Sequence, residues 1–233
     1  MNGNKACTGR IVVLVLPDVN LLDLGGPVQV FDTVSYLGAG YRIEYVADSP
    51  ETVSAQGLRL AGLGPLPRTR SGDLVLVPGP RLRAAAPLVT ATVTRWLRDA
   101  AAGGTRLASV CSGAAAHAEA GLLDGRRCTT HWSLTEPMRR RYPFAQVQDD
   151  VLYVNDGAVS TSAGISAGID LALSLVERDH GPALTAAVAR ELVVYLGRAG
   201  GNGQISPFLE YRNHLHPVVH RVQDHLAHLT FPS

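Results

Sequence analysis

Apolar residues occur along this chain in two patterns, short continuous runs and longer stretches with helical spacing. The continuous runs are Arg10–Leu16, Asp73–Val77 and Thr105–Val110. Such runs are typical of strands that are buried on both faces of a parallel sheet. Tyr41–Ala47 alternates between apolar and polar residues and predicts a further strand. Helices are expected from near Pro27 to Leu37 and over Pro87–Ala102, and this alternation predicts an α/β fold with a mostly parallel sheet.

Turn signals predict two hairpins and two more helices. Thr52–Leu60 is interrupted by a glycine and indicates a short hairpin. Asn155-Asp156-Gly157 predicts a tight turn between two short strands of Gln146–Thr161. Gly164–Glu177 and Pro182–Tyr195 have the spacing of long helices.

The character of the chain changes near residue 197. Gly197–Gly203 is rich in glycine, and His216–Leu229 then carries apolar residues at helical spacing. We therefore expect a compact domain over residues 1–197, followed over residues 198–233 by a linker and one amphipathic helix. That helix lacks an evident partner within the chain.

Composition narrows the class of protein. Hydrophobic residues make up 46% of the 233 residues and charged residues 18%, which argues against disorder, and a net charge of +1 gives no general affinity for nucleic acid. The polar start lacks the apolar core of a signal peptide, and no apolar run approaches the ~20 residues that cross a membrane. Cys7, Cys111 and Cys128 are too scattered for a disulfide framework. We expect a cytoplasmic protein without a membrane partner.

No metal site and no cofactor are expected either. The five histidines between His214 and His228 have no accompanying cysteine and suit a solvated helix face. The glycines of Gly197–Gly203 follow a helix instead of a strand, so they do not form a dinucleotide-binding loop.

Cys111 is the main chemical candidate. It ends a strand and is followed at once by a helix of small residues, which places its sulfur on a sharp strand-to-helix turn at the carboxyl edge of the sheet. We expect the N-terminus of that helix to favour the thiolate. The alternative is a cysteine that only fills a small space in the core.

Asp23 follows the first strand and reaches the same sheet edge, so its carboxylate is a candidate proton acceptor for the thiol. Its alternative role is the N-cap of the helix expected near Pro27. Ser112 and Gly79 are candidate backbone N–H donors to a developing oxyanion. Pro80 has no N–H, so this oxyanion site is poorer than a Gly-Gly turn would supply, which counts against catalysis.

His131 is the candidate imidazole near Cys111, in the segment Cys128-Thr129-Thr130-His131-Trp132. The alternative, that His131 caps or packs without meeting the thiol, is the preferred one. His117 lies six residues beyond Cys111 and cannot reach back around the turn, so it is expected on the surface or in packing, and Cys128 in the core.

Several motifs resemble a known family. Leu22-Asp23-Leu24 with the following Gly-Pro27, Val77-Pro-Gly, and Ser109-Val-Cys111-Ser-Gly-Ala are similar to the PfpI-type branch of the class I glutamine amidotransferase-like superfamily. Ala118–Arg127 with Thr129–Trp132, and Thr161–Leu173, resemble the GlxA-like subgroup of AraC-type transcriptional regulators and its relative isonitrile hydratase. The resemblance extends from about Arg10 to Leu229. It implies a flavodoxin-like three-layer α/β sandwich with a cysteine elbow, usually paired as a dimer.

The resemblance also implies functions and roles. The regulators carry two helix-turn-helix units after this domain, and His216–Leu229 resembles the start of that region, so DNA would be bound only through a part mostly missing from this chain. The family's thiol falls on Cys111, the hydratase's acidic partner on Asp23, and the residue after the thiol on Ser112. Gly79, Cys111, Ser112 and His131 are the expected ligand-binding residues.

The leading hypothesis is a domain that senses a small metabolite for an AraC-type regulator. The second is a thiol enzyme of the isonitrile hydratase kind, and the third is a redox-sensing or purely dimerising domain. Proteolysis is disfavoured, because Ser112 stands where protease-like members have histidine.

Overall fold

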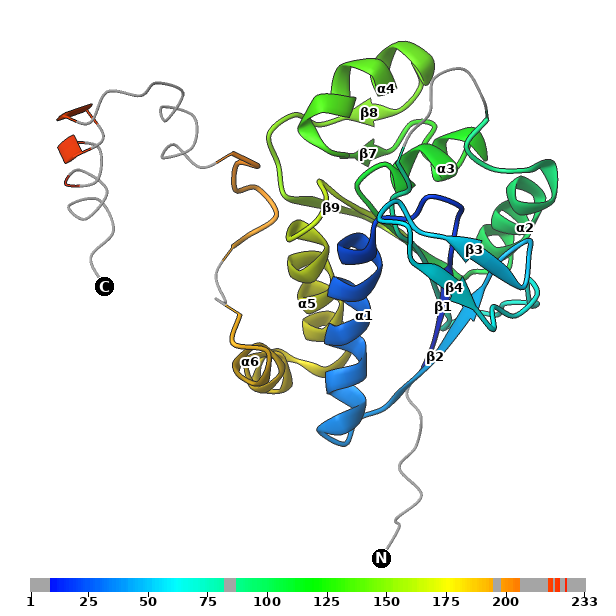
Figure 1. The fold of residues 1–233 in the computed structure, drawn as a ribbon, viewed down its shortest axis with the longest axis horizontal. Helices are drawn as coiled ribbons and strands as arrows, with labels where there is room; N and C mark the ends of the chain where they lie inside the picture. The colour runs from blue at the N-terminus through cyan, green and yellow to red at the C-terminus, as the bar shows by residue number, and fades with distance from the viewer. Residues whose placement is uncertain are drawn as a thin grey trace, which may run out of the picture. The chain divides into compact units, whose positions relative to one another are not determined.

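The computed structural model describes residues 9–81, 87–194, 198–205, 218–219, 221–222 and 225. The chain forms two compact units, residues 1–202 and residues 203–233. The first unit contains all the named helices and strands (Figure 1).

Six strands form the central sheet of the first unit, in the order β2-β1-β5-β6-β10-β9. They are β1 (Gly9–Leu14), β2 (Tyr41–Val46), β5 (Leu74–Val77), β6 (Arg106–Val110), β9 (Tyr153–Asp156) and β10 (Val159–Ser162). The pairs from β2 to β10 are parallel, and β9 pairs with β10 in the antiparallel direction. The antiparallel hairpin of β3 (Glu51–Val53) and β4 (Arg59–Ala61) and the parallel pair of β7 (Arg127–Cys128) and β8 (Gln146–Val147) are separate sheets.

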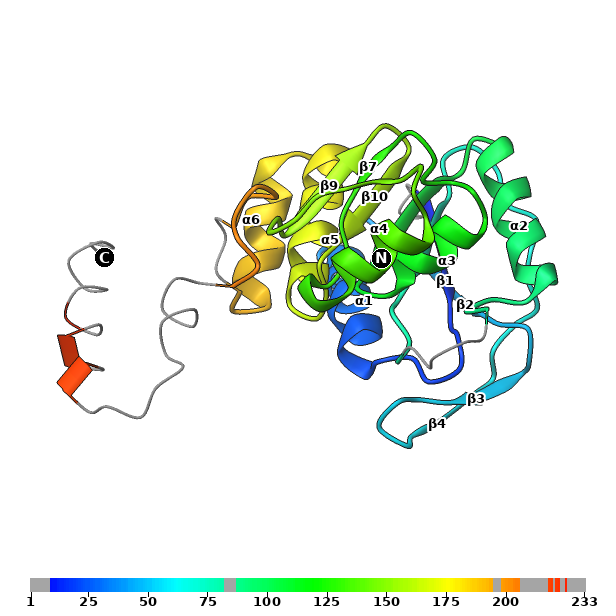
Figure 2. The same ribbon diagram turned by 90° about the horizontal axis from the view of Figure 1, so that it is seen from above.

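Helices cover both faces of the sheet (Figure 2). They are α1 (Leu21–Tyr36), α2 (Ala91–Ala102), α3 (Gly113–Glu119), α4 (Thr135–Arg141), α5 (Ala167–His180) and α6 (Pro182–Glu191), with a 3-10 helix at Trp132–Leu134. The alternation of side chains along β1 explains the two cores. Ile11 and Val13 pack with α1, α5 and α6, whereas Val12 and Leu14 pack with α2 and α3. The flavodoxin-like sandwich and the mostly parallel sheet are thus confirmed.

Helix α1 begins earlier than the sequence suggested. It starts at Leu21, and Leu24 donates to the carbonyl of Asn20 at 3.0 Å, so Pro27 lies inside the helix and not at its first turn. The expected start near Pro27 was therefore wrong. Pro27 has no N–H, so α1 lacks the hydrogen bond to the carbonyl of Asp23 at this point.

Helix α2 begins later than expected, at Ala91 instead of Pro87. The Thr90 side chain caps it by accepting the N–H of Val93 at 3.2 Å. The N–H groups of Leu88 and Val89 are bound by the carboxylate of Glu119 at 2.9–3.2 Å, which holds this segment outside the helix.

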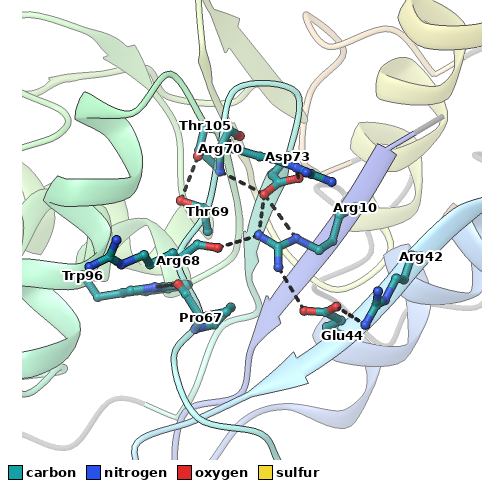
Figure 3. A network of polar contacts seen from close by, with 10 residues as sticks. All are labelled: Arg10, Arg42, Glu44, Pro67, Arg68, Thr69, Arg70, Asp73, Trp96 and Thr105. Atoms are coloured by element: carbon teal, nitrogen blue, oxygen red, sulfur yellow. Dashed lines mark hydrogen bonds and ion pairs between the residues drawn. The ribbon is translucent and has the colours of Figure 1, made fainter. Parts of the chain in front are cut away.

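An arginine network joins the amino ends of β1, β2 and the loop before β5 (Figure 3). Arg10 donates to Asp73 from Nε at 3.1 Å, to Glu44 from Nη1 at 3.3 Å and to the carbonyl of Arg68 from Nη2 at 2.7 Å. Arg42 forms a second ion pair with Glu44 at 2.9 Å. These contacts link the three segments at the amino edge of the sheet, opposite the edge that carries Cys111.

The first unit extends to Asn202, because the Leu152 N–H bonds to the carbonyls of Gly200 and Asn202 at 2.8 and 3.0 Å. In the second unit, residues 218, 219, 221, 222 and 225 are helical, and the rest of the expected helix lies outside the described residues. No helix in the part of the chain that the structure describes is long and apolar enough to cross a membrane.

Candidate functional site

Cys111 lies on the sharp turn between β6 and α3, with a backbone φ of +56°. Only a left-handed backbone lets the chain reverse from strand to helix so abruptly, and for a residue with a side chain this conformation is strained. The Cys111 N–H donates to the carbonyl of Ser162 at 3.0 Å, and its carbonyl accepts the Thr130 hydroxyl at 2.8 Å. The predicted cysteine elbow is confirmed, and β10 and the segment after β7 hold it in place.

Two glycines allow this turn to pack. A Cβ at Gly113 would lie 2.1 Å from the carbonyl oxygen of Val77, so no other residue fits there without movement of the backbone. A Cβ at Gly164 would lie 3.0 Å from the Cys111 sulfur, and Gly164 has a φ of +136°. Gly164 was not among the site residues expected from the sequence. Its one signal was the motif Thr161–Leu173 in the family resemblance.

Asp23 is fully buried in the first turn of α1 and faces the elbow. Its Oδ1 accepts the N–H of Ile165 at 2.8 Å, and among the described residues its Oδ2 has no hydrogen bond of normal geometry. The Cys111 thiol and the Asn20 side chain both interact with this carboxyl group. The alternative role as N-cap was wrong, since Asn20 holds that position.

The pair of Asp23 and Cys111 retains a proton. Burial raises the pKa of Asp23, and the Ile165 N–H and the thiol lower it in part. Burial, and then the charge of Asp23, raise the pKa of the Cys111 thiol to about 12. The expectation that the helix N-terminus favours the thiolate was therefore wrong. Helix α3 has only seven residues, and its dipole does not outweigh the burial of the sulfur together with the carboxylate beside it.

Gly79 and Ser112 complete this cluster. A Cβ at Gly79 would lie 2.7 Å from Ser112 Oγ and 2.8 Å from Asp23 Oδ2, so the Gly79 backbone directly contacts both groups. The Ser112 hydroxyl donates to the carbonyl of Pro80, and its backbone N–H interacts with the Cys111 sulfur. Asp23, Gly79, Cys111 and Ser112 are thus brought together as the sequence predicted. We call them the thiol cluster.

His131 is positioned differently. Its Nδ1 lies 2.8 Å from Ser133 Oγ and accepts the Ser133 N–H at 3.3 Å, so the imidazole caps the 3-10 helix. Its ring also lies 5.4 Å from that of Trp132. The neighbouring Thr130 contacts the elbow through its hydroxyl, whereas the hydrogen bonds of the His131 ring are directed to Ser133. This geometry corresponds to the preferred alternative for His131.

The remaining histidine and cysteine candidates are His117, Cys128, Cys7 and the C-terminal histidines. His117 is fully buried, and neither ring nitrogen has a hydrogen-bond partner among the described residues. Burial lowers the pKa of His117 to about 4. Cys128 is buried in the core, which raises the pKa of its thiol to about 11, and Cys7 lies outside the described residues. Of the C-terminal histidines only His225 is described, and no group of three potential metal ligands occurs within the described ranges.

Residues 9–178 match the sequence model of the DJ-1/PfpI family. The chain belongs to this family. Its motifs around Asp23 and Cys111 are therefore parts of a DJ-1/PfpI domain, as the resemblance implied.

Two named relatives have different functions. The HTH-type transcriptional regulator CdhR of Pseudomonas aeruginosa is 37% identical over 154 residues, which cover 65% of this chain and 44% of CdhR. The isonitrile hydratase of Pseudomonas putida is 34% identical over 172 residues, which cover 72% of this chain and 71% of the hydratase. The match to the regulator thus spans less than half of that protein.

A solved structure agrees with this assignment. The crystal structure of an AraC family transcriptional regulator from Pseudomonas putida superimposes with a TM-score of 0.70 and 25% identity, covering 78% of this chain and 98% of that one. Drosophila melanogaster DJ-1beta gives a TM-score of 0.68 at 19% identity, which shows a common fold.

Proposed function

We propose that this chain is the effector-binding domain of an AraC-type transcriptional regulator and that the thiol cluster binds its small-molecule effector. The observation that carries the proposal is the similarity to CdhR, supported by the regulator structure that superimposes over 98% of its length. DNA would be bound by a helix-turn-helix region mostly outside this chain. We expect the domain to act as a homodimer in the cytoplasm.

The chemistry of the thiol cluster fits recognition of a small polar molecule. The buried Asp23 carboxylate and the Cys111 thiol are a matched acceptor and donor, and a buried polar group without a full set of partners has a strong preference for a ligand that supplies them. Ligands with a carbonyl or a nitrogen group provide such donors and acceptors. Pro80 supplies no N–H beside Gly79, so stabilisation of an oxyanion is weak and binding without turnover is favoured.

The test combines binding with genetics. The 233-residue chain is screened by thermal shift against small amines, amides, carbonyl compounds and isonitriles, because saturation at about 100 times Kd stabilises a protein by about 2.7 kcal/mol. An effector should stabilise the wild-type chain and fail to stabilise Asp23→Asn. The reading frame beyond Ser233 should continue into two helix-turn-helix units, and the same effector should change transcription from the regulator's promoter. A reading frame that ends at Ser233 would contradict the proposal.

A second function is supported by the same pair of side chains. The similarity to isonitrile hydratase covers 71% of that enzyme, and Asp23 lies beside Cys111 as an acid–base partner. In this mechanism the Cys111 sulfur bonds to the terminal carbon of the isonitrile, while Asp23 transfers the thiol proton to the same carbon, which gives a thioimidate. Water then adds to the C=N carbon, and the C–S bond breaks. The sulfur regains a proton and an N-substituted formamide leaves.

Enzyme assays distinguish the two functions. Formamide production from cyclohexyl isocyanide, followed by chromatography, should be lost in Cys111→Ala and reduced in Asp23→Asn if the chain is a hydratase. His131→Ala is a matched control, because the ring hydrogen-bonds to Ser133 and should be dispensable. Absence of turnover across a panel of isonitriles would exclude this second function and leave the first untouched.

A further inference from the structure

A cavity lies apart from the thiol cluster, at the carboxyl ends of β1 and β2. It has a volume of about 380 Å³ and is bounded by the end of β1, the segment after β2, β3 and the start of α2. These elements lie close together in both ribbon views (Figures 1 and 2). Its lining does not include Asp23, Gly79, Cys111 or Ser112. We call it the α2 cavity.

The α2 cavity lies beside the usual ligand site of this fold. Strand β1 lies between β2 and β5, and the switch-point crevice of such a sheet opens between β1 and β5, where Asp23 and Gly79 of the thiol cluster lie. The α2 cavity opens instead at the carboxyl ends of β1 and β2. The cavity walls are apolar and include the buried side chains of Val15, Leu16, Val89 and Val93. A volume of this size with apolar walls is typical of a small-molecule pocket.

The polar groups of the α2 cavity carry negative charge. Asp48 and Glu51 both line it and are exposed, and none of the described lining residues is a lysine, arginine or histidine. Asp48 accepts the Thr90 hydroxyl, which fixes the carboxylate without neutralising it. Glu51 is 3.6 Å from Arg59, but both side chains are more than half exposed, so this ion pair is weak.

From this combination we propose that the α2 cavity binds a small organic cation, with an apolar body in the cavity and an ammonium group at the Asp48 carboxylate. Burial of the ligand's apolar body against the cavity walls favours binding, and the carboxylates favour a positively charged ligand over a neutral or negative one. The proposal is independent of the function of the thiol cluster.

Three probes of the same shape test the selection of charge: 4-phenylbutylamine, 4-phenylbutan-1-ol and 4-phenylbutanoate at pH 7, each titrated into the full chain by calorimetry. The amine should bind more tightly than the alcohol, and the carboxylate most weakly. Asp48→Asn should weaken amine binding by about fivefold, the upper range for a solvated ion pair, and should leave the alcohol unchanged. Asp99→Asn is the matched control, because Asp99 is exposed on α2 and outside the cavity lining.

Location is tested by filling the cavity. Val93→Phe should abolish binding of the amine and the alcohol, and thermal unfolding checks that this variant folds. Glu51→Gln gives a second, exposed position if Asp48→Asn is unstable. Cys111→Ala should retain the wild-type affinity for the amine, which separates this site from the thiol cluster. Equal binding of the three probes, no binding at all, or amine binding that survives both Asp48→Asn and Glu51→Gln would overturn the proposal.

Discussion

The buried imidazole of His117 should make the stability of this domain depend on pH. His117 has no exposed surface, and both ring nitrogens lack partners among the described residues. Burial lowers its pKa from 6.5 to about 4, so the unfolded chain binds a proton at a higher pH than the folded chain. The free energy of unfolding is therefore not reduced by His117 above pH 6.5, and it decreases as the pH falls from 6.5 toward 4. The loss between pH 7 and pH 5 is about 2 kcal/mol.

His117→Leu should remove this dependence and stabilise the protein. Leucine is similar in size and needs no hydrogen bond, so the variant avoids the cost of about 1–3 kcal/mol that an unsatisfied buried polar group incurs. The gain in the free energy of unfolding should be about 1–3 kcal/mol at pH 7 and about 2 kcal/mol larger at pH 5. Urea unfolding followed by circular dichroism at both pH values measures the four quantities.

His117→Asn is the matched control. Its amide does not titrate but leaves polar atoms in the same apolar surroundings, so it should lose the extra pH dependence without the gain at pH 7. Because other titrating groups are common to all three proteins, they cancel in the differences between variants. If the gain of His117→Leu over the wild type were equal at pH 5 and pH 7, the imidazole would not be held neutral by burial, and the reasoning would fail.

Three further predictions address the thiol cluster, the elbow packing and the amino edge. Asp23→Asn removes the buried charge and should lower the pKa of Cys111. Iodoacetamide should then alkylate the thiol faster at pH 8, by about tenfold for each pH unit by which that pKa falls. Mass spectrometry measures the rate, and slower alkylation would contradict the pairing of Asp23 with Cys111. Gly113→Ala forces a Cβ against backbone and should lower the free energy of unfolding by more than about 2 kcal/mol, whereas Gly25→Ala, with open space around it, should not destabilise. Arg10→Met leaves the buried Asp73 carboxylate without its main partner and should lower the free energy of unfolding by about 3–5 kcal/mol. Urea unfolding measures this loss, and a loss below about 1 kcal/mol would show that the arginine network contributes little to stability.

The order of elements was predictable from the sequence because hydrophobic pattern and turn chemistry agree there. The continuous apolar runs became β1, β5 and β6. The hairpin predicted at Asn155-Asp156-Gly157 is that of β9 and β10, although Asn155 and Asp156 end β9 and the turn itself is Gly157-Ala158. The elbow was predictable for the same reason, since a strand followed at once by a helix of small residues leaves room for only one kind of turn. The meeting of Asp23 with Cys111 followed from the rule that parallel strands end at one edge.

The remaining features depend on contacts between distant segments. The start of α2 is decided by Glu119, which lies on α3 and binds the N–H groups of Leu88 and Val89. The burial of His117 depends on how tightly α3 packs on the sheet. The spacing of His117 from Cys111 in the sequence does not predict that packing. The walls of the α2 cavity likewise come from three segments that are far apart in the sequence, residues 15–17, 47–52 and 87–93.

The electrostatics of the elbow also bear on the third hypothesis, a redox sensor. Oxidation by peroxide requires the thiolate, and a thiol with a pKa of about 12 is almost fully protonated at neutral pH. Neither of the other two functions needs a thiolate in the resting protein. When S–H adds to an electrophile, Asp23 accepts the proton as the sulfur reacts. When a ligand binds, it replaces the carboxylate as the hydrogen-bond partner of the thiol. The buried carboxylate thus favours the binding and hydratase functions over peroxide sensing. In a peroxide titration, the Cys111 sulfenate should accumulate more slowly in the wild type than in Asp23→Asn, and the opposite order would restore the redox hypothesis.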